Sequence, residues 1–372
     1  MVNERRLTDT FLRLASIPGL SRQEREVAEA AASELRACDF TVSFDDAGEK
    51  VGGNTGNVIA SKKGAVSGGC PIALNAHLDT VGPVEGWSYR AEDGTIHSGG
   101  TSILGADDRI GIAAILEAVR VLAEDGIPHA DLQVILTIAE EVGLLGAKHL
   151  DCTRVCSRYV FVIDSSQRLG ALTICGPSQD TIAATFHGRA AHAADPDRGI
   201  SAIVAASKAV ARMQLGRLDP ETVANVGIIR GGRAGNIVPD RCEVRAEARS
   251  RDESKLRAQV QHMTEALREG AAEAGAEVEI QVTRSYSSYR LTEQDPPVAL
   301  AYEAARAIGV TPEFVQVMGG SDANVFNSIG LPSLALWMGL RDAHSLEESA
   351  IIGDAAKCAE LLIGIARLAA KQ

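Results

Sequence analysis

Four short apolar runs, each the length of a β-strand, constrain the fold of this 372-residue chain more than any other feature. They are rich in Val, Ile, Leu and Ala, and stretches with helical periodicity separate several of them. Strands that alternate with helices predict a sheet that is covered by helices on both faces. The predicted strands are 72–76, 132–138, 159–163 and 334–338, and the predicted helices are 5–16, 110–123, 144–150 and 351–370.

The segment SRQE predicts the start of a second N-terminal helix. Ser21 and Glu24 have the spacing of a capping box, in which the two side chains bond reciprocally to the first main-chain N–H groups of a helix. We expect this helix to run to about Ala37.

Residues 176–288 follow a different pattern, with strands whose faces alternate and two amphipathic helices. The expected order of strands and helices is β-α-β-β-α-β, which is the ferredoxin-like plan. A chain of this length is also too long for one typical core. We therefore expect a smaller α+β domain over 176–288, inserted into a larger α/β domain that comprises 1–175 and 289–372.

Composition narrows the classes of partner. The formal net charge of −12 argues against nucleic acid or an anionic membrane as the main partner. The N-terminus lacks the apolar segment of a signal peptide, and no run reaches the ~18 apolar residues of a membrane span. The seven cysteines are scattered and odd in number, which is typical of a reduced protein. We expect a cytoplasmic protein with no nucleic-acid and no membrane partner.

Acidic side chains and two histidines follow the predicted strands, at or just beyond the point where each strand ends. Ligands of open α/β sheets gather at the carboxyl ends of strands, so one shared site would account for all of these side chains together. The residues are His77 and Asp79, Asp107 and Asp108, Glu140 and Glu141, Asp164, and His344.

Nitrogen and oxygen donors of this kind suit Zn²⁺, and also Mn²⁺ or Co²⁺. Clustered carboxylates without a cation would repel one another, and the donors are too many for one tetrahedral ion. Two metal ions fit the number of donor residues better than one, and Asp107 is a candidate for a carboxylate that binds both ions. Each residue alone has a simpler explanation: the Glu pair could begin a helix, and the Asp pair could cap one. It is improbable that four strand ends and the loop with Asp107 and Asp108 all carry such residues without a shared function.

Seven segments, in order, resemble the signatures of the M20 metallopeptidases, over nearly the whole chain. TSILGADDRIG and GGSDANVFNSIGLP most resemble the peptidase T branch, the aminotripeptidases. The resemblance implies a zinc-peptidase-like catalytic domain, with a mixed sheet flanked by helices, and an inserted ferredoxin-like lid and dimerisation domain. The segments are HLDTV, GADDRIGIAAI, AEEVGLLGA, VIDSS, GRAAHAADPDRGISAI, GGRAGNIVPDRCEVRAEAR and AHSLEE.

The resemblance also implies metal ligands. His77 and Asp164 should bind one zinc ion, Glu141 and His344 a second, and Asp107 should bridge the two ions. The peptide bond between Asp107 and Asp108 is often cis in such enzymes.

Two further carboxylates have implied roles in catalysis. Asp79 should hydrogen-bond the far nitrogen of His77 and so fix its tautomer. Glu140 should be the general base, which takes a proton from the metal-bridging water and later delivers it to the leaving amine.

In the inserted domain, the resemblance implies three substrate-binding residues and a homodimer. His192 should reach the active site of the partner subunit as an oxyanion donor. Asn236 and Arg249 should bind the polar ends of the substrate, because a guanidinium can grip a terminal carboxylate in bidentate fashion. The GGSDAN loop at 319–324 should lie near the substrate, and closure of the lid would exclude water.

The sequence therefore predicts a dizinc metallopeptidase that hydrolyses short peptides as a tripeptidase-like aminopeptidase. An N-acyl-amino-acid deacylase or a dipeptidase on the same scaffold is an alternative, because the metal site would be identical. A non-catalytic binding protein that has kept the fold is a second alternative. It predicts no hydrolysis of any amide even with zinc supplied.

Overall fold

The computed structural model describes all residues, 1–372, and the chain divides into two compact units. None of its helices is long and apolar enough to cross a bilayer. Unit 1 consists of Met1–Ile174, Arg290–Gln316 and Ser321–Gln372, and unit 2 consists of Cys175–Tyr289 and Val317–Gly320.

The core of unit 1 is a nine-stranded mixed sheet in the order β1-β2-β6-β3-β7-β18-β8-β16, with β17 paired to β8. Its central strands β6, β3, β7 and β18 run parallel, whereas β1, β2 and β8 pair antiparallel to their neighbours. The α/β class with a mixed sheet is thus confirmed. The strands are β1 (Thr41–Phe44), β2 (Val58–Lys62), β3 (Ile72–His77), β6 (Leu132–Thr137), β7 (Tyr159–Ile163), β8 (Ala171–Gly176), β16 (Tyr289–Arg290), β17 (Glu313–Gln316) and β18 (Ser333–Leu336).

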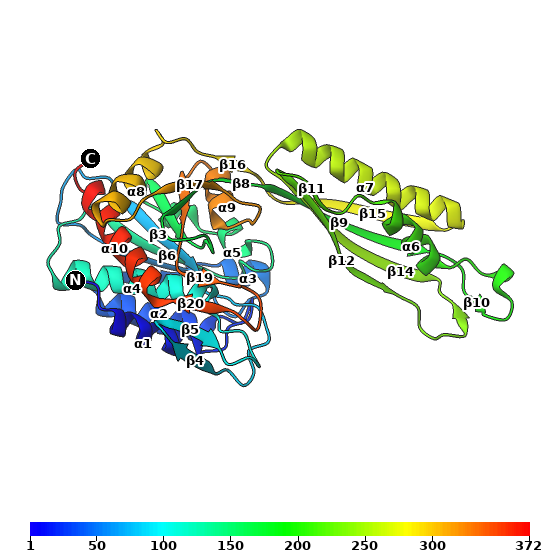
Figure 1. Ribbon diagram of the computed structural model, residues 1–372, viewed down its shortest axis with the longest axis horizontal. Coiled ribbons are helices and arrows are strands. Elements are labelled where there is room, and N and C mark those ends of the chain that lie inside the picture. The colour runs from blue at the N-terminus through cyan, green and yellow to red at the C-terminus, as the bar shows by residue number, and fades with distance from the viewer. The chain divides into compact units, whose positions relative to one another are not determined.

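Helices flank this sheet, as Figure 1 shows for α1, α4 and α10. α1 begins at the cap Asn3, whose side chain accepts the Arg6 N–H, and it buries a stripe of Leu7, Phe11 and Leu14. α4 packs on α1, α10 and β3, and most of its residues are therefore buried. The helices are α1 (Glu4–Ala15), α2 (Arg25–Ala37), α3 (Ala47–Val51), α4 (Ala106–Glu124), α5 (Leu145–Lys148), α8 (Pro296–Ala307), α9 (Asp322–Ser328) and α10 (Ile352–Ala369), with the 3₁₀ turn η1 (Cys152–Arg154).

The predicted capping box of α2 is wrong. The cap residue is Glu24, whose side chain makes no capping bond, and the Arg25 N–H donates to the Asn54 side-chain oxygen at 3.0 Å instead. The Ser21 hydroxyl instead donates to the Asp79 carboxylate, and Glu24 turns inward to accept main-chain N–H groups of Arg22 and Ala139. Long-range partners thus take both side chains away from the local motif.

A small four-stranded sheet in unit 1, ordered β19-β20-β5-β4, was not expected from the sequence. Its strands are too short and too exposed for a clear apolar pattern. The loop between β19 and β20 carries His344. The strands are β4 (Tyr89–Glu92), β5 (Thr95–Ser98), β19 (Leu340–Arg341) and β20 (Ser349–Ile351).

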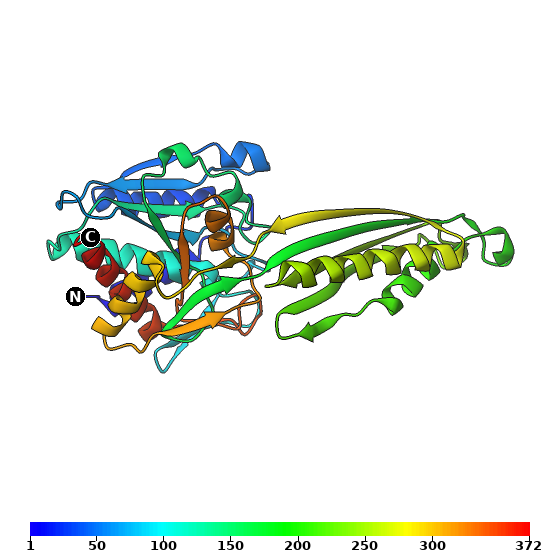
Figure 2. The same cartoon turned by 90° about the horizontal axis from the view of Figure 1, so that it is seen from above.

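Unit 2 has a five-stranded antiparallel sheet in the order β11-β12-β14-β9-β15. Helices α6 and α7 cover one face, and Figure 2 shows α7 lying along the strands. The β-α-β-β-α-β order of the ferredoxin-like plan is present, and β11 and the β10–β13 ribbon are additions. The elements are β9 (Ser178–His187), β10 (Ala191–His192), η2 (Pro196–Arg198), α6 (Ala202–Arg212), β11 (Gly216–Asp219), β12 (Thr222–Gly231), β13 (Ile237–Val238), β14 (Arg241–Ser250), α7 (Glu253–Ala274) and β15 (Glu277–Tyr286).

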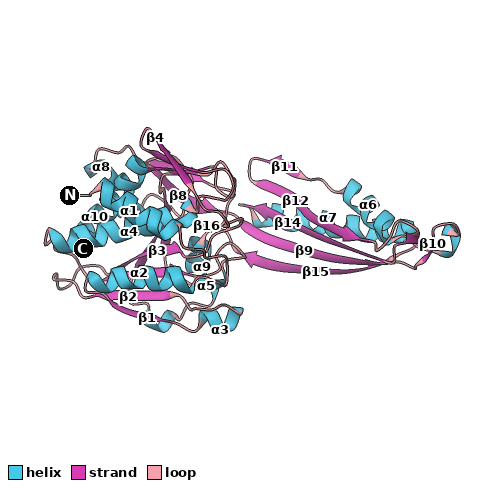
Figure 3. Ribbon diagram, turned by 90° about the horizontal axis from the view of Figure 1, so that it is seen from below, coloured by secondary structure: helices cyan, strands magenta, loops and turns pink.

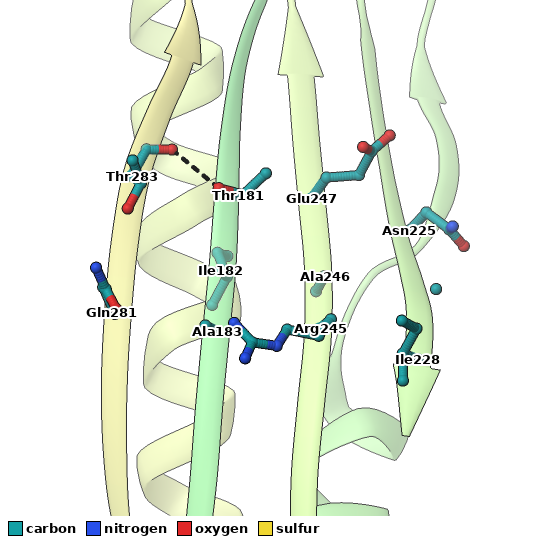
Figure 4. A pocket seen from close by; sticks show the side chains of 11 residues that line it. Thr181, Ile182, Ala183, Asn225, Ile228, Arg245, Ala246, Glu247, Gln281 and Thr283 are labelled. Carbon is teal, nitrogen blue, oxygen red and sulfur yellow. Dashed lines mark hydrogen bonds between the residues drawn. The ribbon is translucent and has the colours of Figure 1, made fainter. Parts of the chain in front are cut away.

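The two faces of this sheet differ in polarity. The face under α6 and α7 buries apolar side chains such as Ile182 and Ala246. Figure 3 shows β12, β14, β9 and β15 side by side on the opposite face, and Figure 4 shows a shallow pocket there. Polar side chains, among them Arg245 and Glu247, line this pocket, and the Thr181 hydroxyl donates to the Thr283 carbonyl at 3.2 Å. This open face is therefore suited to contact with water or a polar partner.

Candidate metal centre

The sheet of unit 1 gathers the polar residues that follow its parallel strands. His77 is the last residue of β3, Glu140 and Glu141 follow β6, and Asp164 follows β7 directly. Because β6, β3 and β7 are parallel neighbours, these residues leave the sheet at the same edge. Asp107 reaches the same place from the start of α4, and His344 reaches it from the β19–β20 loop.

Asp107 lies between the two imidazoles. Its Oδ1 is 3.0 Å from His77 Nε2, and its Oδ2 is 3.3 Å from His344 Nε2. His344 Nε2 is also 2.8 Å from Oε1 of Glu141. One ligand atom each from His77, Asp107 and Glu141 lie within 4.8 Å of one another, and this converging set of N and O donors fits a divalent metal ion.

The electrostatics of the centre indicate an unbalanced negative charge. Burial and then the charge of Asp164 raise the pKa of Glu140 well above its usual range, and burial with the neighbouring carboxylates does the same to the pKa of Asp164. Asp107 stays ionised: burial opposes this, but hydrogen bonds from His344 and His77 hold its pKa below the usual range. Hydrogen bonds to Asp107 and Glu141 raise the pKa of His344 to about 10. A bound cation would remove the repulsion between these carboxylates.

Asp79 is fully buried and acts mainly on the main chain. Its Oδ1 accepts the Glu140 N–H at 2.9 Å, and its Oδ2 accepts the Glu141 N–H at 3.2 Å and the Ser21 hydroxyl at 2.6 Å. His77 Nδ1 is 3.0 Å from the Asp79 carbonyl oxygen and 3.5 Å from its carboxylate. The Asp79 carboxylate thus lies beside His77 Nδ1, but the shorter contact of this nitrogen is with the Asp79 carbonyl oxygen.

Further buried carboxylates hold the main chain of the centre. Asp108 Oδ2 accepts the His77 N–H at 3.0 Å, and the two Glu348 oxygens accept the Asp107 and Gly105 N–H groups at 2.9 Å. The bond between Asp107 and Asp108 is cis, as the resemblance implies. Glu348 had no predicted role. Its only signal was its place in the AHSLEE segment.

Asp322 was also missed as an individual residue. It begins α9, within the GGSDAN segment, and is buried. Its Oδ2 accepts bonds from the Thr137 hydroxyl and, at 3.5 Å, from the Asn75 amide. Burial raises the pKa of Asp322 to about 6. Its charge also raises the pKa values of Glu140 and Asp164, so Asp322 belongs to the surroundings of the centre.

In unit 2 the structure brings together two of the three predicted substrate-binding residues. His192 and Asn236 share the β10–β13 ribbon, where the Ala193 N–H donates to the Asn236 carbonyl. Both are exposed. Arg249 lies near the opposite end of β14, roughly 25–30 Å away by strand length. It forms an ion pair with Glu247 at 2.9 Å.

Comparison with known proteins agrees with this geometry. The family model for peptidase family M20/M25/M40 matches residues 73–368. The chain belongs to the M20 peptidase family. The family resemblance read from the motifs is therefore confirmed, and this M20 peptidase is a hydrolase.

Three similar proteins cover the whole chain. The peptidase is 38% identical to the uncharacterized protein YqjE of Bacillus subtilis, over 100% of both chains. Its structure is similar to that of aminopeptidase PepT from Bacillus cereus, with 37% identity, complete coverage of both chains and a TM-score of 0.86. It is also similar to a tripeptidase from Staphylococcus aureus, with 35% identity, complete coverage of both chains and a TM-score of 0.92.

Proposed function

We propose that this M20 peptidase is a dizinc aminopeptidase that releases the N-terminal residue of short peptides. The observation that carries the proposal is the position of Asp107 between His77 and His344, with Glu141 beside it. This arrangement suits a carboxylate shared by two ions. The similarity to an aminopeptidase and a tripeptidase supports the class of substrate.

The donors divide into two sets around Asp107. We assign His77 and Asp164 to one ion and Glu141 and His344 to the other, with zinc as the first choice and Mn²⁺ or Co²⁺ as substitutes. Bound ions of this kind supply a positive charge that polarises a carbonyl and lowers the pKa of water. The direct contacts of Asp107 with the two imidazoles, and of His344 with Glu141, bring together four of the five donors that this assignment uses.

Glu140 is the general base in this proposal. The Glu140 main-chain N–H donates to Asp79, which fixes the backbone at this residue. The side-chain carboxylate is the group that would accept and donate the proton. Glu140 takes a proton from the attacking water and delivers it to the amine of the leaving peptide. Its raised pKa in the metal-free protein suits a group that must hold a proton part of the time.

Unit 2 supplies the substrate contacts and the dimer interface in this proposal. Arg249 binds one polar end of the peptide, and Asn236, which shares the β10–β13 ribbon with His192, acts together with His192 in the active site of a second subunit. Arg249 and His192 are far apart along the sheet, which supports the assignment of the two residues to two different active sites.

A dimer through unit 2 is supported by the outer edge of β12. This strand pairs with β11 only at Thr222–Ala224. The side chains of Ile228 and Ile229 beyond that point are 40% and 49% exposed. An apolar edge of this kind is a template for pairing with a second strand. The seven free cysteines support a reducing compartment, which we propose to be the cytoplasm.

One set of assays tests the activity. The protein is stripped with EDTA, reloaded with zinc and incubated with Ala-Ala-Ala, Ala-Ala and N-acetyl-Ala. Release of alanine from the tripeptide alone supports the proposal. Cleavage of N-acetyl-Ala instead indicates a deacylase, cleavage of Ala-Ala alone indicates a dipeptidase, and no hydrolysis of any amide with zinc bound indicates a binding protein.

A further inference from the structure

The three residues 139–141, which include the proposed base, have their main-chain N–H groups held by two buried carboxylates. Glu24 Oε1 accepts the Ala139 N–H at 2.9 Å. Asp79 accepts the next two, from Glu140 and Glu141, at 2.9 and 3.2 Å. The element that supplies Glu24, at the start of α2, is 115 residues away in sequence.

The carbonyl groups of Ala139 and Glu140 also accept hydrogen bonds. The Ala139 carbonyl accepts the Leu145 N–H at 3.0 Å, and the Glu140 carbonyl accepts the N–H groups of Gly143 and Leu144 at 2.9 and 2.7 Å. The main chain at Glu140 is therefore fixed on both sides. Such a main chain delivers the Glu140 side chain in one orientation.

Ala139 has a left-handed backbone, with φ of 51°. A residue with a Cβ adopts this conformation at a cost, so the surrounding contacts must hold it there. The bond from Ala139 to Glu24 is one of those contacts. Without it, residues 139–141 could relax toward a conformation in which Glu140 points elsewhere.

A buried carboxylate at position 24 costs folding free energy that a purely structural role would not require. Its side chain is fully buried, and its Oε2 has no hydrogen-bond partner. A buried carboxylate costs free energy unless it is fully paired, and a methionine of similar length would fill the space more cheaply. Its two hydrogen bonds, from Arg22 and Ala139, therefore favour a carboxylate at this position, and so does the positive charge of the buried Arg109, with which the charges of Glu24 and Asp79 interact favourably.

We propose that Glu24 is a positioning residue that holds Ala139 and thereby aims the Glu140 side chain during catalysis. The proposal rests on the proposed function of Glu140 as the general base. Glu24 itself touches neither substrate nor metal in this account. It acts through the hydrogen bond to Ala139, not through its charge.

Three variants separate these contributions. Glu24→Met removes the acceptor, and Glu24→Gln keeps an oxygen acceptor without the charge. Glu117→Met is the matched control, because Glu117 is equally buried and also accepts a main-chain N–H, from Asn3 at 2.7 Å, but it bonds to α1 and not to residues 139–141. The measurements are kcat and KM on a short peptide, zinc content, and amide hydrogen exchange of fragments that cover 138–142.

We expect Glu24→Met to lower kcat by roughly 10- to 100-fold, which is the range for residues that orient the groups of a metal site through hydrogen bonds. KM and zinc content should stay near the parent values. Exchange at 139–141 should accelerate. Glu24→Gln should stay within about threefold of the parent kcat, since its oxygen still accepts the bond. Glu117→Met should lower the melting temperature without changing kcat.

Three results would overturn the proposal. One is a parental kcat in Glu24→Met, and another is a loss in Glu24→Gln as large as in Glu24→Met. The third is rapid exchange of the 139–141 amides in the parent protein, which decides the matter even if Glu24→Met fails to fold. If the parent hydrolyses no peptide, the proposed function fails, and exchange in the metal-free protein still tests the bond from Ala139 to Glu24.

Discussion

Most candidate residues of unit 1 are buried and held from several directions, except the half-exposed His344, whereas His192 and Asn236 of unit 2 are exposed and have few partners. His77 is 2% exposed and contacts Asp107 and Asp79, while His192 is exposed and its ring accepts only a local N–H from Ala194. The cluster of unit 1 is therefore preorganised within one chain. The residues of unit 2 require a substrate or a second subunit to become a site. Preorganised electrostatics provide the larger share of most catalytic effects, so we expect the two regions to differ in mutational cost.

The largest effect is expected at the residue that joins both halves of the cluster. Asp107→Asn removes one charged oxygen from the position between His77 and His344, so two ions can no longer share it. We expect no measurable peptide hydrolysis and a zinc content below two ions per chain, by elemental analysis. Parental activity in this variant would remove Asp107 as the shared ligand.

Glu140→Gln separates chemistry from metal binding within the same cluster. Because Glu140 is assigned to proton transfer and not to coordination, kcat should fall by about 10²- to 10⁴-fold while zinc content stays unchanged. Rates and metal content are measured on the same preparation. Loss of zinc together with loss of activity would place Glu140 among the ligands instead.

A mixing experiment tests whether unit 2 acts across subunits. His192→Ala should lower kcat by roughly 10²-fold or more, as for other oxyanion donors. Glu140→Gln and His192→Ala, unfolded together and refolded at equal amounts, should recover about a quarter of the parental activity, because half of the dimers are mixed and each has one intact site. No recovery, in a protein that is dimeric by ultracentrifugation, would place His192 in the site of its own chain or outside any site.

The sequence predicted the candidate metal ligands of unit 1 better than the buried carboxylates that hold the main chain around them. Short apolar runs located β3, β6 and β7, and the residues after them proved to be neighbours because parallel strands end at one edge. Glu24 and Glu348 could not be found in this way. Their bonds join main-chain groups 115 and 241 residues away, and no local pattern records such a partner.

A different limit, strand length, explains several of the strands that were not predicted, although β8 was missed despite its six mostly buried residues. β1 and the strands of the small sheet are two to four residues long and partly exposed, so neither alternation nor an apolar run marks them. In unit 2, by contrast, the ten-residue strands β9 and β14 alternate cleanly, because α6 and α7 cover only one face. Local patterns are therefore informative where one face is buried over a long stretch.

Arg249 offers a smaller test of the comparison. Its guanidinium is paired with Glu247 through Nε and Nη2, and its Nη1 makes a long contact of 3.4 Å with the Met318 carbonyl. Hydrogen bonds from this charged group to a substrate carboxylate are worth about 1.5–3 kcal/mol. Arg249→Ala should therefore raise KM for a free tripeptide by roughly 10- to 100-fold. Arg245→Ala, four residues earlier on the same open face, is the control and should leave KM unchanged. Equal effects of the two variants would reduce Arg249 to a surface charge.

The last prediction concerns pH and the metal-free cluster. The pKa of His344 is raised to about 10 by hydrogen bonds to Asp107 and Glu141, above roughly 6.5 for a free imidazole. Protonated His344 therefore stabilises the metal-free fold fully below about pH 6.5, and this contribution is lost as the pH rises through about 10. A metal ion must displace that proton, so zinc affinity should rise by up to tenfold per pH unit for each proton displaced between about pH 7 and 10. Calorimetry in buffers of different ionisation enthalpy counts the protons released. In His344→Ala the count should fall by one, and an unchanged count would show that His344 does not bind the metal.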